Sequence, residues 1–278
     1  MSYQPPAPPP PPPPPPDPPE RPRWPAWFAP AAFVVVVGAT TVLAGIVLAI
    51  AGKEPDDSDA VVTIIGTVIQ AAVFIGTAVM FASFVDKPKP WQFGLRRTKF
   101  WPAVGWAALG LLAFYVFAAL YTALAQPDVE QTVTKELGAD QGTAGLIAAG
   151  VVVIVLAPLS EEFFFRGFFF RALRNRFPLL LAAGIDGLVF GFIHWDFSTA
   201  HGLLIVPPLA VLGFVFCLIY ERTGSLFPVI ALHAINNSAA YAAQVHDGWT
   251  VSVVAGPLMI AALMLAPRAL PRVAPAPG

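Results

Sequence analysis

Charged side chains are scarce in this chain. Lysine, arginine, aspartate and glutamate make up only 12% of its 278 residues, against roughly 25% in soluble domains. Hydrophobic residues make up 56%. The formal net charge is only -1, so bulk charge points neither to a nucleic acid nor to an acidic partner. This composition predicts a protein that lies in a lipid bilayer and has no nucleic-acid partner.

Cysteine is nearly absent as well. The single Cys217 lies in an apolar run and has no second cysteine to pair with, which excludes an internal disulfide. We interpret it as a packing residue. The HExxH motif of many zinc proteases is also missing from the sequence.

Proline is concentrated at the start of the chain. Residues 1–27 are dominated by it, and such a segment forms neither helix nor sheet but samples extended polyproline II. We predict a disordered, cytoplasmic proline-rich tail. Trp24 and Trp27 close this segment and suit a membrane interface, where amphipathic rings are stable.

Long apolar segments account for most of the remaining chain. A membrane-spanning helix needs about 20 mainly apolar residues, because only a helix satisfies its own backbone polar groups in lipid. The sequence predicts an all-α fold, a polytopic membrane helix bundle with about eight transmembrane helices in residues 28–267, followed by a cytoplasmic tail at 268–278. The expected spans are 28–50, 61–85, 100–125, 144–173, 179–195, 203–221, 225–243 and 250–266.

Basic residues set the expected orientation, since cytoplasmic loops carry the excess of lysine and arginine. If the N-terminus is cytoplasmic, thirteen of the sixteen basic residues fall on the inner side. The outer loops hold only Lys53 and Lys135. We therefore expect a multi-pass protein of the plasma membrane with both termini in the cytoplasm.

Ionisable residues inside the spans are concentrated in the second half of the chain. Charge deep in a bilayer is costly and usually marks a functional cavity. Glu161 and Glu162 are adjacent and point about 100° apart on a helix, whereas Glu162 and Arg166 are four residues apart and share a face. Glu162 and Arg166 are predicted to pair, which leaves Glu161 free to face a substrate or a water. Asp186 either orients a catalytic group, pairs with Arg166 or bonds to a neighbouring backbone or hydroxyl group.

The same spacing recurs on two further spans. His233 and Asn237 are four residues apart, as are Phe190 and His194. Polar groups from three apolar spans are expected to meet in one active site. We place the catalytic core at about residues 144–243.

Three motifs, EEFFFR at 161–166, FGFIH at 190–194 and HAINN at 233–237, resemble the signature of the CAAX protease and bacteriocin-processing family, also called abortive-infection proteins. Its members are intramembrane endopeptidases. The order EExxxR, FxxxH and HxxxN is the same, with each motif on its own hydrophobic segment. The resemblance covers about residues 155–240.

The resemblance implies a role for each motif residue. Glu161 and His194 would activate a water that attacks a peptide carbonyl, while His233 and Asn237 would stabilise the oxyanion. Glu162 and Arg166 would form a supporting ion pair, although some accounts of the family give both glutamates a direct role.

Metal dependence stays open at this point. Members of the family are commonly grouped with metalloproteases, and Glu161, His194 and His233 form a plausible zinc set that leaves one position for water. The same residues serve a mechanism without metal, so zinc is an option and no cofactor is certain.

Two other functions stay open. Intramembrane acids and histidines also serve transporters and proton relays, and a chain with these motifs could be a non-catalytic, immunity-type membrane partner. For a protease, the expected substrate is a membrane-associated protein or peptide, with a lipidated one as an option, in a bacterial host.

Overall fold

Helices form every regular element that the structure describes. The computed structural model describes residues 22–54, 59–126, 133–195 and 202–270. Within these ranges all elements are helical, which confirms the predicted all-α class. Residues 1–21 of the predicted proline-rich tail and residues 271–278 of the predicted C-terminal tail lie outside the described residues.

The long helices follow the apolar segments of the sequence. Residues 142–174 form one continuous rod in which two π-helical segments, η2 and η3, interrupt the α-helix. The elements of the rod are α5 (Gly142–Val151), η2 (Val152–Leu156), α6 (Ala157–Phe164), η3 (Phe165–Phe169) and α7 (Phe170–Arg174). The other long helices are α1 (Phe28–Ala51), α2 (Ala60–Ser83), α3 (Phe100–Ala125), α8 (Leu179–Phe192), α9 (Val206–Thr223), α10 (Leu226–Gln244) and α11 (Gly248–Leu265). Short elements are η1 (Pro90–Phe93), α4 (Val133–Glu136), η4 (Gly202–Ile205) and η5 (Ala266–Ala269).

Six helical stretches of the described chain are long and apolar enough to cross a membrane. All eight predicted segments are helical, but two of them miss these criteria, so the count of eight is not confirmed. Helix α8 has only 14 residues, and α10 carries His233, Asn236 and Asn237 among its apolar residues. The long helices expose large apolar side chains such as Leu112 and Leu124, as helices in contact with lipid do.

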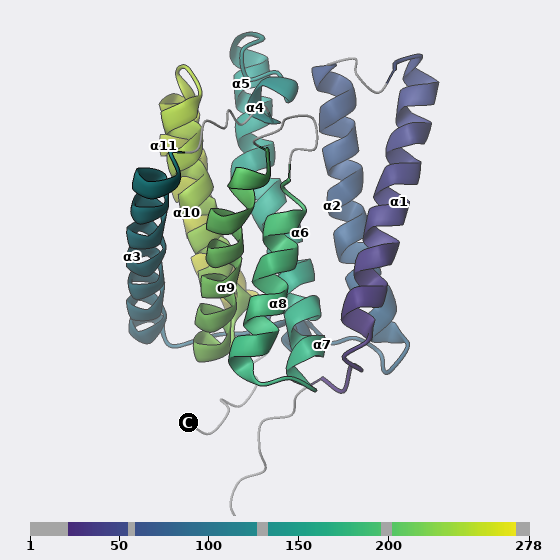
Figure 1. The fold of residues 1–278 in the computed structure, drawn as a ribbon, viewed down its shortest axis with the longest axis vertical. Helices are drawn as coiled ribbons and strands as arrows, with labels where there is room; N and C mark the ends of the chain where they lie inside the picture. The colour runs from purple at the N-terminus through teal and green to yellow at the C-terminus, as the bar shows by residue number, and fades with distance from the viewer. Residues whose placement is uncertain (1–21, 55–58, 127–132, 196–201, 271–278) are drawn as a thin grey trace, which may run out of the picture.

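The helices run roughly side by side in one bundle (Figure 1). The α1–α2 pair forms one flank of the bundle and α3 the other (Figure 1). Helices α6, α8 and α9 lie between these flanks, and α10 packs against α11 and against α6. The motif-bearing elements are therefore the inner ones.

Both described chain ends lie at the same end of the bundle. Arg97, before α3, donates a hydrogen bond of 2.8 Å to the carbonyl of Pro267 near the C-terminus. Asn175, after α7, donates one of 2.7 Å to the carbonyl of Pro22 near the N-terminus. This agrees with the expected placement of both termini on one side, while the identity of that side stays a prediction.

The two tryptophans that precede α1 differ in their surroundings. Trp27 is 63% exposed, as an interfacial residue should be, but Trp24 is 2% exposed. The Trp24 ring lies 5.1 Å, between centroids, from both Phe93 and Phe168. Trp24 is thus a core residue at the end of the bundle, and the prediction of an interfacial position fits Trp27 alone.

Candidate active site

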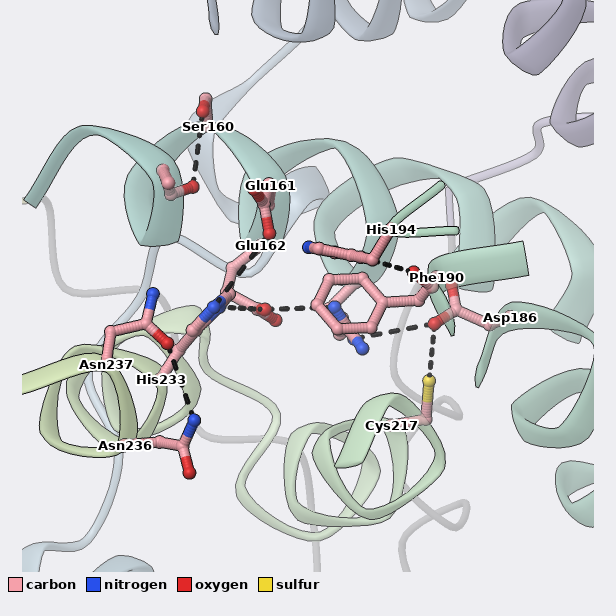
Figure 2. A network of polar contacts seen from close by, with 12 residues as sticks. Ser160, Glu161, Glu162, Asp186, Phe190, His194, Cys217, His233, Asn236 and Asn237 are labelled. Atoms are coloured by element: carbon pink, nitrogen blue, oxygen red, sulfur yellow. Dashed lines mark hydrogen bonds and ion pairs between the residues drawn. The ribbon is translucent and has the colours of Figure 1, made fainter. Parts of the chain in front are cut away.

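The three sequence motifs meet inside the bundle. Glu161 and Glu162 lie on α6, Arg166 on η3, and His233 on α10. His194 lies in the turn that follows α8, because α8 ends at Phe192 rather than at the predicted residue 195. Figure 2 shows Glu161, Glu162, His194 and His233 converging from α6, the turn after α8, and α10.

Glu162 is the centre of a fully buried polar network. Its Oε1 accepts a hydrogen bond of 2.9 Å from NH1 of Arg166, which confirms the predicted pair. The same oxygen lies 2.8 Å from Nδ1 of His233. Nε of Arg166 lies 3.4 Å from Oδ1 of Asp186, so the guanidinium stands between two carboxylates. Of the alternatives predicted for Asp186, the structure shows the pairing with Arg166.

Aromatic rings enclose the guanidinium of Arg166. Its central carbon lies 4.4 Å from the ring centroid of Phe190, 5.2 Å from that of Phe216 and 5.7 Å from that of Phe165. Cation–π attraction is stronger in such a water-poor setting than at a surface. Paired carboxylates and rings offset part of the cost of burying this cation, whose Nε and second terminal nitrogen have no hydrogen-bond partner among the described residues.

Glu161 is held differently from its neighbour. Its side chain is 14% exposed, and Oε2 lies 3.9 Å from Nε2 of His233, too far for a hydrogen bond. That oxygen is buried and has no hydrogen-bond partner. Oε2 of Glu162 and Oδ2 of Asp186 also lack a partner, and such buried atoms call for an explanation such as a catalytic role or a bound water. The free carboxylate oxygen fits the predicted role of facing a water or a substrate.

His194 presents one side of its ring to the same place. Its Nδ1 lies 2.8 Å from the carbonyl oxygen of Phe190, which fixes the ring, and the ring centroids of these two residues are 5.0 Å apart. Figure 2 shows the other ring nitrogen directed toward the Glu161 carboxylate. Phe190 also contacts His233, with 5.9 Å between ring centroids, so one aromatic ring links the two histidines.

Asn237 contacts a backbone carbonyl of the rod. Its Nδ2 donates a hydrogen bond of 2.9 Å to the carbonyl of Val153 in η2. The π-helical register explains this contact, since Ala157 N–H donates to Val152 and Pro158 has no N–H to offer. Val153 therefore lacks a helical donor, and Asn237 supplies one from α10.

Close contact between α8 and α9 positions Asp186, Phe190 and His194. A Cβ on Gly187 would lie 2.5 Å from the carbonyl oxygen of Ala210, and one on Gly191 would lie 2.7 Å from that of Val206. Gly187 and Gly191 form a GxxxG pattern, which lets membrane helices touch backbone to backbone. The sequence reasoning missed this pattern, although the spacing is readable in the sequence.

Cys217 extends the network beyond the predicted residues. Its Sγ lies 3.0 Å from Oδ1 of Asp186, and both side chains are fully buried. The interpretation of Cys217 as packing alone was wrong, because the thiol donates a hydrogen bond. No sequence signal identified this contact, which depends on how α9 lies against α8.

The candidate zinc ligands are Glu161, His194 and His233. In the described ranges no three or more His, Cys, Asp and Glu side chains are grouped as a metal ion would require. Nδ1 of His233 and Nδ1 of His194 are engaged with Glu162 and Phe190, which leaves Nε2 of each ring available. In the described arrangement Glu161, His194 and His233 are not gathered closely enough to hold a metal ion, so no step is derived through one.

The region that holds these three motifs is similar to a known protein family. Residues 143–239 match the family described as Rce1-like, type II CAAX prenyl endopeptidase. The match covers all three motifs and confirms the resemblance seen in the sequence.

Two curated relatives share part of the chain. An "Uncharacterized 24.3 kDa protein" of Escherichia coli is 32% identical over 133 residues, which is 47% of this chain. The "Putative membrane peptidase YdiL" of Bacillus subtilis (strain 168) is 31% identical over 88 residues, which is 32% of this chain. The matched regions span 59% and 34% of the lengths of these relatives. No solved structure matches the chain.

Proposed function

We propose that this protein is an intramembrane endopeptidase of the CAAX type that hydrolyses a peptide bond of a membrane-associated protein or peptide. The observation that carries the proposal is the unpartnered, buried Oε2 of Glu161 beside Nε2 of His233. The similarity of residues 143–239 to a family of prenyl endopeptidases supports it.

Water activation falls to Glu161 and His194 in this proposal. Glu161 accepts a proton from a water while the ring of His194 holds that water by a hydrogen bond. The water oxygen attacks the peptide carbonyl, and the proton passes to the nitrogen of the leaving amine. General base catalysis of this kind is typically worth about a hundredfold to ten-thousandfold in rate.

Oxyanion stabilisation falls to His233 and Asn237. Nδ1–H of His233 donates to Glu162, so Nε2 faces the reacting carbonyl and donates to the oxyanion when the ring carries its second proton there. Nδ2 of Asn237 donates one of its hydrogens to the carbonyl of Val153, and its second hydrogen can be donated to the oxyanion. Glu162 and Arg166 act through His233, by fixing the orientation of its ring.

Substrate and location are part of the same proposal. The substrate is a protein or peptide anchored in the bilayer, and a lipidated segment is the option that the matched family favours. The protein is a multi-pass component of the plasma membrane whose described chain ends face the cytoplasm, in keeping with the basic residues at that end.

Cleavage of a membrane-embedded reporter peptide tests this function. The full chain is reconstituted in vesicles with a reporter that carries one transmembrane helix and a fluorescent tag. Glu161→Gln keeps the size of the side chain and removes the base, so cleavage should fall by a factor of about a thousand. Glu221→Gln is the matched control, because Glu221 pairs with Arg174 away from the site. Cleavage by Glu161→Gln at the control rate would refute the proposal.

A further inference from the structure

A cleft lies at the end of the bundle where both described chain ends are found (Figure 1). It is a largely open cleft of about 610 Å³, lined by residues 22–27, which precede α1, together with Asn175 and Arg176, which follow α7. It is separate from the candidate active site, none of whose residues line it.

The walls of the cleft are well held. Asn175 donates hydrogen bonds of 2.7 Å to the carbonyls of Pro22 and Trp24, which fix the segment before α1 against the end of α7. Trp24 anchors the same segment between Phe93 and Phe168. The cleft therefore has defined walls made by two segments far apart in the sequence.

Among the residues that the structure describes, the charge of the cleft is positive and uncompensated. Arg23 and Arg176 are both exposed, and no acidic residue is among the lining residues. Neither arginine forms an ion pair with any residue that the structure describes, whereas nearby Arg174 pairs with Glu221 at 2.8 Å. Two unpaired guanidinium groups at one cleft favour an anionic ligand.

The position of the cleft at the edge of the apolar bundle indicates which class of anionic ligand it binds. Trp27 lines the cleft and is 63% exposed, and the apolar helix α1 begins at the next residue. Exposed tryptophan at the edge of an apolar helix marks the level of the lipid headgroups. Basic residues at this level attract the anionic headgroups of the cytoplasmic leaflet.

We propose that this cleft binds the phosphate of an anionic phospholipid headgroup. Arg23 and Arg176 contact the phosphate oxygens from the two walls, and Trp27 packs against the glycerol region. This binding site does not depend on the proposed peptidase activity.

Lipid retention by the full chain tests the proposal. The protein is reconstituted in nanodiscs of phosphatidylcholine with a minor share of phosphatidylglycerol, released into detergent, and examined by native mass spectrometry for bound lipid. The wild type should retain phosphatidylglycerol in preference to phosphatidylcholine. The double variant Arg23→Gln/Arg176→Gln should lower the affinity for phosphatidylglycerol by about tenfold to thirtyfold.

Three comparisons make the test specific. Lys87→Gln/Lys89→Gln removes the same charge from the loop after α2 at the same end of the bundle, and should leave retention near that of the wild type. Arg23→Lys/Arg176→Lys should restore part of the affinity. Equal losses in the glutamine variants of both pairs would overturn the proposal in favour of diffuse attraction, and so would unchanged retention in the arginine variant. Binding of inorganic phosphate as tightly as the lipid would overturn the assignment of a lipid ligand.

Discussion

Replacing Arg166 with methionine removes the guanidinium that stands between two fully buried carboxylates. Glu162 and Asp186 each lie within 3.4 Å of it, and the side chains of all three are 0% exposed. Leaving a buried charge without its partner typically costs about 3–5 kcal/mol, so Arg166→Met should destabilise the bundle by this amount. Asp186→Asn in the same chain removes one of the two stranded charges. The double variant should therefore lose about 1–3 kcal/mol less than the sum of the two single losses.

Unfolding in mixed micelles measures this cycle. The free energy of unfolding is obtained by titration with sodium dodecyl sulfate, followed by the loss of helical circular dichroism. Arg222→Met serves as the control, since Arg222 stacks on Trp106 outside the network and should cost less than about 1 kcal/mol. If the double variant loses the full sum of the single losses, Arg166 and Asp186 do not interact and the buried network is wrong.

Three further predictions test other parts of the structure. Gly187→Ala should lower the free energy of unfolding by about 1–3 kcal/mol, because its Cβ would meet the backbone of α9, whereas Gly184→Ala has open space and should be nearly neutral in the same micelle titration. Asn237→Ala should lower the free energy of unfolding by about 1–3 kcal/mol, because the carbonyl of Val153 in η2 loses its donor. It should also slow reporter cleavage about a hundredfold. Cleavage at the wild-type rate would show that Asn237 does not stabilise the oxyanion. Asp59 accepts backbone hydrogen bonds at the start of α2, and these bonds lower the pKa of its carboxyl. Its contribution to stability should therefore be complete above about pH 3.9 and disappear as the pH falls through the lowered pKa. Acid titration of Asp59→Asn should not show this loss of stability.

Interactions within one helix were predictable from spacing alone. Glu162 and Arg166 are four residues apart on one rod, and helix periodicity places them on one face whatever the rest of the bundle does. The same spacing predicted that Glu161 points away from Arg166 and does not pair with it. Interactions between helices were less accessible, because they depend on how each helix is rotated about its axis. His233 was expected to face the substrate, and its contact with Glu162 appears only once α10 is packed against α6.

Local departures from the regular helix were beyond the sequence reasoning. Spacing predicted one uniform helix over 144–173, but η2 and η3 shift the register on either side of the glutamates. Pro158 is a cause of the register shift at η2, because a residue without an N–H leaves a carbonyl about one turn earlier without its hydrogen-bond donor. The burial of Trp24 likewise depends on Phe93 and Phe168, which lie far along the chain and have no pattern that links them to it.

The short length of α8 has a consequence for the surrounding lipid. Its 14 residues extend about 21 Å, less than the roughly 30 Å of a bilayer hydrocarbon core. Such a hydrophobic mismatch thins the bilayer locally or admits solvent above the end of the helix. His194 lies at that end, so the mismatch gives water a route to a place that a full-length span would keep dry.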